Sequence, residues 1–267
     1  MTEGPDCKAS SQVCAVLAQL TAGLRSILGE QLIGIYLYGS LITGDFLPSV
    51  SDIDLVVVLK EALNQARFEK LHQLHENVTR RRPEWEDRLE LAYIAQSALR
   101  TFRSQTSIIG IISPGEPFHL ISAGADWLIS WYALRENGFA LFGPPVQSLF
   151  APIAAADYLR AVHEHINGYR RLAAETSNRQ FLSYIVLTVA RGHYTLQHGE
   201  PTSKIKAAAW AGERYPQWSA LLEIALALRA DAGHEAPATA QLRIDVEAFV
   251  AFVLAEALKA EFSALNR

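Results

Sequence analysis

Two aspartates interrupt an otherwise apolar run in YLYGSLITGDFLPSVSDIDLVVVL, residues 36–59. The stretches 32–38 and 52–59 are β-branched and apolar, with the length of buried strands. Successive side chains of a strand point to opposite faces, so Asp52 and Asp54 share one face while Ile53 shares the other with Leu55. The pattern therefore predicts two core strands that present a pair of carboxylates at one point.

The rest of the first half alternates between helix and strand signals. Apolar residues at helical spacing predict helices over 11–28, ended by Gly29, and over 63–81. Strands are predicted at 88–95 and 106–113, followed by a turn at 114–117 and a helix over 121–136. This order predicts an α/β domain over residues 1–150.

The second half contains only helical patterns. Strand signals stop near residues 144–153, where Pro144, Pro145 and Pro152 cluster. Amphipathic or buried helices are predicted at 157–175, 179–198, 219–232 and 240–262. We therefore expect an all-helical domain over residues 151–267.

Composition excludes several functional classes. The net charge of −4 across 267 residues lacks the basic footprint of a nucleic-acid binder. The longest apolar runs are shorter than the roughly 20 residues that cross a bilayer, so no membrane association is expected. Cys7 and Cys14 are too few for a disulfide framework and are expected as free thiols. These features predict a cytoplasmic protein, monomeric or dimeric.

A turn before the aspartates suggests what they bind. Gly39 and Ser40 follow the first strand, where a glycine lets the backbone approach a ligand and a serine hydroxyl holds phosphate oxygens. Two close carboxylates repel each other unless a cation neutralises them, and Mg²⁺ binds through carboxylates plus substrate phosphates. The pattern predicts a site for a Mg²⁺–nucleoside triphosphate complex, without the G-x-x-x-x-G-K-[ST] sequence of a P-loop.

A third carboxylate, Glu90, lies inside the strand RLELAYIA, with Leu89 and Leu91 on the opposite face. A buried glutamate is costly unless it is paired or coordinated. If this strand neighbours that of Asp52 and Asp54, Glu90 serves either as a metal ligand or as the base that accepts a proton from an attacking hydroxyl.

These motifs resemble the nucleotidyltransferase superfamily, in which GS is followed some ten residues later by D-x-D. The chain as a whole resembles the aminoglycoside O-nucleotidyltransferases of the streptomycin and spectinomycin adenylyltransferase type. That resemblance extends through ADWLISWYALRENGFALFGP and VLTVARGHYTLQHGEPTSKIKAAAWAGERYP, and covers most of residues 30–230. It implies a polymerase-beta-like mixed sheet with helices, followed by a helical bundle. It also implies Mg²⁺-dependent transfer of AMP from ATP to a hydroxyl of a cationic small molecule, the reaction of antibiotic-resistance enzymes.

The resemblance also assigns roles to individual residues. It implies that Gly39 and Ser40 contact the triphosphate and that Asp52 and Asp54 hold Mg²⁺. Glu90 falls where the family keeps its general base. In the helical half, the match of VLTVAR and TSK implies that Arg191 and Lys204 contact the nucleotide phosphates.

One position departs from the family pattern. Members that accept streptomycin have acidic and Trp residues just before the VLT segment, whereas this chain reads ETSNRQFLSYIVLT, with Phe181 about where an acidic residue is expected. The acceptor is therefore spectinomycin, another aminocyclitol or an unrelated hydroxyl compound. Two other functions stay open: a nucleotidyltransferase acting on a protein or tRNA, and a nucleotide-binding regulator without catalysis.

Overall fold

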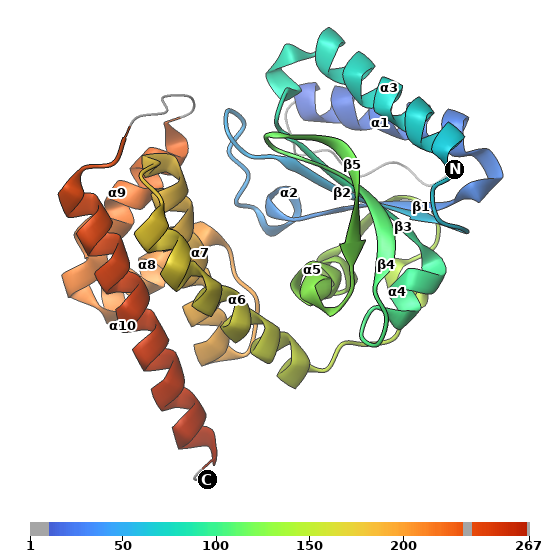
Figure 1. Cartoon of the computed structure of the whole chain (residues 1–267). Helices are drawn as coiled ribbons and strands as arrows, with labels where there is room; N and C mark the ends of the chain where they lie inside the picture. The colour runs from blue at the N-terminus through green and yellow to red at the C-terminus, as the bar shows by residue number, and fades with distance from the viewer. Residues whose placement is uncertain (1–10, 232–236, 266–267) are drawn as a thin grey trace. The chain divides into compact units, whose positions relative to one another are not determined.

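The computed structural model describes residues 11–231 and 237–265, which form parts of two compact units, residues 1–153 and 154–267 (Figure 1). The first unit is a six-stranded sheet with helices, and the described part of the second consists of helices α6 to α10 and their connections, which confirms the predicted fold class. In chain order the first unit contains α1 (Ser11–Leu28), β1 (Leu32–Tyr38), α2 (Ser40–Thr43), β2 (Ile53–Leu59), α3 (Gln65–Arg81), β3 (Leu89–Ala95), α4 (Gln96–Thr101), β4 (Ser107–Ser113), β5 (Glu116–Ala123), α5 (Leu128–Asn137) and β6 (Phe139–Phe142).

The sheet is mixed, with strand order β5-β4-β3-β2-β1-β6. Only β2 and β3 run parallel, and the other neighbouring pairs are antiparallel. α3 connects the parallel pair, as a crossover between parallel strands requires. The two strands with the predicted carboxylates are therefore central neighbours.

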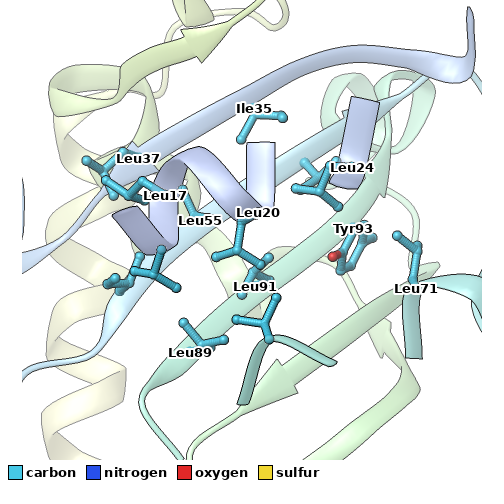
Figure 2. Close-up of a cluster of buried hydrophobic side chains, with 14 of the residues drawn as sticks. Leu17, Leu20, Leu24, Ile35, Leu37, Leu55, Leu71, Leu89, Leu91 and Tyr93 are labelled. Atoms are coloured by element: carbon cyan, nitrogen blue, oxygen red, sulfur yellow. The ribbon is translucent and has the colours of Figure 1, made fainter. Parts of the chain in front are cut away.

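One face of the sheet packs against α1 and α3 (Figure 1). Figure 2 shows the apolar side chains between these layers: Leu17, Leu20 and Leu24 of α1, Leu71 of α3, and Ile35, Leu37, Leu55, Leu89, Leu91 and Tyr93 of the strands. Alternate strand residues make up this core, because successive side chains point to opposite faces. The strand residues that alternate with these core residues therefore point to the opposite face of the sheet. In the same unit, α5 contacts β1.

α1 has a strongly apolar composition. Residues Ser11–Gln31 are long and apolar enough to cross a membrane by length and composition alone, contrary to the expectation from the sequence. A core helix meets the same criterion, and the apolar side of α1 is buried against the sheet, with Val16, Leu20 and Leu24 at 0% exposure. Burial of that side explains its apolar composition without a membrane.

The helix predicted over 121–136 begins too early. Residues 121–123 belong to β5, which pairs antiparallel with β4 after the turn at Gly115, and α5 starts only at Leu128. Apolar residues of a half-buried strand and of a short helix give similar local patterns, and the pairing with β4 decides between them.

The prediction of free thiols is also wrong for Cys14, which is disulfide-bonded. It depended on the small number of cysteines in the chain, and a count does not decide whether a given cysteine is bonded. Cys7 itself lies outside the described residues.

The second unit contains α6 (Ala155–Glu175), α7 (Arg179–His198), α8 (Lys204–Arg214), α9 (Ser219–Ala230) and α10 (Ala240–Leu265). α7 is the central helix and contacts α6, α8, α9 and α10. Its N-terminus is capped by Asn178, whose side chain accepts hydrogen bonds from the amides of Gln180 and Phe181. α8, whose first turn is capped by the Ser203 hydroxyl, is a helix that the sequence patterns did not predict.

Candidate active site

Three neighbouring strands bring Tyr38, Asp54 and Glu90 into one row. Tyr38 of β1 lies opposite Asp54 of β2, and Asp54 lies beside Glu90 of β3. Residues paired across neighbouring strands project to the same face, here the face opposite the core formed with α1 and α3. Glu90 was predicted to act as a ligand or base only if its strand neighbours that of Asp54. The two strands are neighbours, so Glu90 lies beside Asp54.

Tyr38 is buried, and the carboxylates of Glu90 and Asp54 lie close enough to affect the pKa of its hydroxyl. Burial raises the pKa of the Tyr38 hydroxyl well above its usual value, and the charges of Glu90 and Asp54 raise that pKa further. A hydrogen bond to Glu90 also favours the protonated phenol. The hydroxyl therefore donates to the Glu90 carboxylate, which fixes that side chain beside Asp54.

Gly39 lies against Asp54. A Cβ atom built on Gly39 would come within 2.0 Å of Asp54 Oδ2, a distance that no real side chain tolerates. The backbone of Gly39 has φ 72° and ψ −150°, a combination that is essentially restricted to glycine. Only glycine therefore lets the chain turn at the end of β1 while Asp54 keeps its position.

Ser40 begins the short helix α2, directly after Gly39. The Gly39 carbonyl accepts hydrogen bonds from the amides of Ile42 and Thr43, and Gly44 in the left-handed conformation ends the helix. Ser40 is half-buried, and its own carbonyl accepts from the Asp45 amide at 3.1 Å. Gly39 and Ser40 thus form a tight turn beside Asp54.

Asp52 lies one residue before β2, in a segment held by Arg88. The guanidinium of Arg88 donates to the carbonyl of Ser51 at 2.7 Å and to that of Pro48 at 2.8 Å. Partial burial lowers the pKa of Arg88, and the nearby charges of Asp52 and Glu84 oppose that shift. Arg88 therefore ties the segment before Asp52 to the start of β3 and lies near the Asp52 carboxylate.

The carboxylates fit a metal that is shared with a substrate. Among the residues that the structure describes, no group of three or more His, Cys, Asp or Glu side chains is arranged to hold a metal ion. The arrangement therefore does not offer a closed protein site made by all three predicted carboxylates. Mg²⁺ typically takes one or two carboxylates and completes its octahedron with water and phosphate oxygens. Asp52 and Asp54, two residues apart, suit that mode.

In the second unit, Lys204 contacts Tyr184, and Arg191 lies near enough to His165 and Tyr169 to affect their pKa values. Lys204 Nζ lies 4.3 Å from the centre of the Tyr184 ring. Burial lowers the pKa of His165, and the charge of Arg191 lowers that pKa further. Burial raises the pKa of Tyr169, as do the charge of Tyr184 and a hydrogen bond with it, whereas Arg191 opposes the shift. Lys204 therefore lies at Tyr184, and the charge of Arg191 acts on Tyr169, the hydrogen-bond partner of Tyr184.

Phe181 also contacts Tyr184. Its ring stacks on Tyr184, with centroids 6.0 Å apart and planes 9° from parallel. Tyr184 is 41% exposed, so the pair presents an aromatic surface about where an acidic residue is expected in a member that accepts streptomycin.

Two residues of the site were missed by the sequence analysis. Tyr38 was read only as part of an apolar strand, although a tyrosine directly before the GS turn could have been noticed. No sequence motif indicates a role for Arg88, because that role depends on hydrogen bonds to backbone carbonyls 37 and 40 residues earlier in the chain.

Comparison with known families gives two matches that together cover most of the chain. Residues 19–102 match the nucleotidyltransferase domain. Residues 148–256 match the C-terminal domain of aminoglycoside adenylyltransferase.

Individual proteins show the same similarity. The chain is 27% identical over 219 residues to a spectinomycin 9-adenylyltransferase of Staphylococcus aureus, covering 76% of this chain and 79% of that protein. It is 29% identical over 271 residues to an aminoglycoside (3'') (9) adenylyltransferase of Escherichia coli, covering 92% and 97%. A crystal structure of a spectinomycin adenyltransferase from Enterococcus faecialis with ATP and spectinomycin superposes with a TM-score of 0.71, covering 91% of this chain and 98% of that one. At 20% identity, this last similarity is one of fold.

Proposed function

The chain belongs to the aminoglycoside adenylyltransferase family of nucleotidyltransferases, and we propose that it moves AMP from ATP to a hydroxyl of an aminoglycoside- or aminocyclitol-like molecule. Pyrophosphate is the second product. The two family matches confirm the resemblance inferred from the motifs. The observation that supports the activity most directly is the pairing of Asp54 with Glu90 on adjacent parallel strands, with Gly39 packed against Asp54.

In the proposed reaction, the acceptor oxygen attacks the α-phosphorus of ATP and the bond to the leaving pyrophosphate breaks. Glu90 takes the proton of the attacking hydroxyl. The Tyr38 hydroxyl, which donates to Glu90, orients that carboxylate and keeps it ionised before the transfer. Positioning and charge stabilisation supply most of the rate in reactions of this class.

The triphosphate is proposed to bind on several groups. The turn at Gly39 and Ser40 approaches the phosphates through backbone and hydroxyl donors. Asp52 and Asp54 would hold Mg²⁺, which supplies charge neutralisation for the phosphates when bound. Arg191 and Lys204 are proposed to bind the phosphate oxygens, as the family resemblance implies and as their positive charges suit.

The acceptor is proposed to differ from streptomycin. Phe181 and Tyr184 form an aromatic surface beside Lys204, where an acidic side chain would be needed to attract a strongly cationic guanidino sugar. An acceptor with fewer positive charges and a C–H ring face that packs on an aromatic side chain, such as an aminocyclitol, suits this surface better.

We propose that the enzyme acts in the cytoplasm, the compartment that supplies ATP, as a monomer or dimer. Fractionation of cells that express it, together with light scattering of the purified chain, tests both statements. Recovery in the membrane fraction, or a larger assembly, would contradict them.

A mass-shift screen tests the activity. Purified protein is incubated with ATP and Mg²⁺ against a panel of aminoglycosides and aminocyclitols, and each compound is examined for the added mass of one AMP. Asp52→Asn should abolish the adduct while the circular dichroism spectrum stays unchanged. Glu223→Gln, an exposed change on α9, serves as the matched control and should keep full activity. Substantial transfer by Asp52→Asn would refute the scheme.

A further inference from the structure

The guanidinium of Arg88 joins two segments of the first unit. Its Nη2 donates to the carbonyl of Pro48 at 2.8 Å and to that of Ser51 at 2.7 Å, and its Nε also donates to the Ser51 carbonyl at 3.2 Å. Its Nη1 donates to the carbonyl of Glu84 at 3.2 Å. These hydrogen bonds use all three nitrogen atoms at once, which the planar fork of an arginine allows.

Arg88 itself is held on two sides. Its carbonyl accepts a hydrogen bond from the Ile53 amide at 2.9 Å, where β2 and β3 begin to pair. Its guanidinium lies 4.6 Å over the ring of Trp85, which is buried in the core between the sheet and α1 and α3. The side chain therefore has a fixed backbone and a fixed aromatic surface, and it holds the Pro48 and Ser51 carbonyls from a rigid base.

The segment that Arg88 holds is a compact turn that leads into Asp52. The Ser51 amide donates to the Leu47 carbonyl at 2.8 Å, and the Leu47 amide donates to the buried Ser51 hydroxyl at 2.9 Å. The Ser51 carbonyl and the Asp52 nitrogen and Cα atoms belong to one planar peptide unit. Arg88 donates two hydrogen bonds to that carbonyl, so it fixes the plane from which the Asp52 side chain projects.

We propose that Arg88 is a positioning residue for the Asp52 carboxylate and thereby sets the affinity of the site for Mg²⁺ bound to the triphosphate. The inference rests on the proposed function, in which Asp52 and Asp54 hold the metal. Asp54 is fixed by pairing within the sheet, whereas Asp52 precedes β2 and depends on the turn. Loss of a group that orients a metal ligand typically costs about 10–100-fold in metal affinity or activity.

The charge of Arg88 is a second way in which it can affect the site. Burial lowers the pKa of Arg88, and the charge of Asp52 opposes that shift, so the two groups also interact through space. Lysine separates charge from position. It keeps the positive charge, but its ammonium is a single point that cannot donate to the carbonyls of Pro48, Ser51 and Glu84 together.

Binding of α,β-methylene-ATP tests the proposal without an acceptor and without catalysis. Calorimetry gives the Kd of this analogue once with excess Mg²⁺ and once with EDTA, and the ratio of the two Kd values is the gain in affinity from the metal. Arg88→Lys should reduce this gain about ten-fold and leave the Kd in EDTA unchanged. Arg82→Lys, the same change at a side chain that donates to Gln19 at 3.0 Å, should not alter the gain.

Two further variants test the turn and the dependence on Asp52. Ser51→Ala removes the hydroxyl that accepts from the Leu47 amide but keeps the carbonyl that Arg88 holds, and it should reduce the gain about three-fold. Arg88→Lys combined with Asp52→Asn should lower the gain no further than Asp52→Asn alone, because Arg88 acts through Asp52. Urea unfolding checks that each variant is folded.

Three results would overturn the proposal. These are an unchanged gain in Arg88→Lys, an equal loss of affinity in EDTA, which would make Arg88 a contact of the nucleotide itself, and a further loss when Arg88→Lys is added to Asp52→Asn. If Asp52→Asn alone leaves the gain intact, the proposed metal role of Asp52 fails together with this inference. If Asp52→Asn lowers the gain and Arg88→Lys does not, only this inference fails.

Discussion

Replacing Gly39 by alanine is expected to damage the site through two separable effects. The first is backbone strain, because Gly39 has φ 72° and ψ −150°. The second is a collision, because the new Cβ would lie 2.0 Å from Asp54 Oδ2 and 2.6 Å from its Cγ. Either the turn after β1 or the Asp54 carboxylate must move.

A matched substitution separates the two effects. Gly44, at the end of α2, also has a positive φ of 77°, but a Cβ there meets nothing within 4 Å. Gly44→Ala should therefore cost only left-handed strain, about 1–2 kcal/mol. Gly39→Ala adds the collision to a strain of about 1–3 kcal/mol, so we expect a total loss of about 2–4 kcal/mol.

The effect on catalysis should differ more sharply than the effect on stability. A displacement of Asp54 by about 1 Å is enough to reduce transfer about 100-fold. Urea unfolding gives the stabilities, and pyrophosphate release with an accepted substrate gives the rates. If Gly39→Ala loses no more stability than Gly44→Ala and keeps its transfer rate, the close contact between Gly39 and Asp54 is not what makes glycine necessary.

Further predictions concern Glu90, Tyr38 and the buried histidines. Glu90→Gln should reduce kcat by about 10²–10⁴-fold while ATP affinity in calorimetry is unchanged; a normal kcat would exclude Glu90 as the base. Tyr38→Phe should reduce kcat about ten-fold at constant ATP affinity, because one hydrogen bond to the Glu90 carboxylate is lost; an effect on ATP affinity alone would argue against positioning of Glu90. Burial lowers the pKa of His75 and of His193 to about 4, below the value of 6.5 in the unfolded chain. The unfolded state therefore binds more protons below pH 6.5, and the free energy of unfolding should fall as pH decreases from 6.5 toward 4, by about 3 kcal/mol for His75 alone. Urea titrations between pH 7 and pH 4.5 measure this slope, and a flat profile would contradict the burial of both rings.

Local sequence patterns predicted many of the elements because their signals lie within a few residues. β1 and β2 were found from β-branched runs, and α1 and α7 from apolar residues at helical spacing. The predicted elements were wrong where pairing between distant segments decides whether a stretch forms a strand or a helix. The segment 121–123 has apolar residues that suit a helix or a strand, and it became strand because β4 supplies its hydrogen bonds. α8 escaped notice because KIKAAAWAGER has small residues in place of a clear apolar stripe.

The same division applies to the candidate site. Gly39, Ser40, Asp52, Asp54 and Glu90 were selected from the sequence by residue type and spacing, since carboxylates inside apolar strands require a charge-balancing partner. Their mutual placement required strand register. Whether Glu90 adjoins Asp54 depends on how β2 and β3 pair, and a shift of one residue would turn Glu90 to the opposite face.

By itself, the sequence determined the fold class and the reaction family and selected the candidate carboxylates, because each depends on short motifs and on periodicity. Only the tertiary structure decided that the Tyr38 hydroxyl donates to Glu90, that Gly39 leaves no room for a side chain beside Asp54, and that Arg88 holds the segment before Asp52. Each of these contacts joins residues far apart in the chain. Their geometry follows from hydrogen-bond register and packing, which no local pattern of residues encodes.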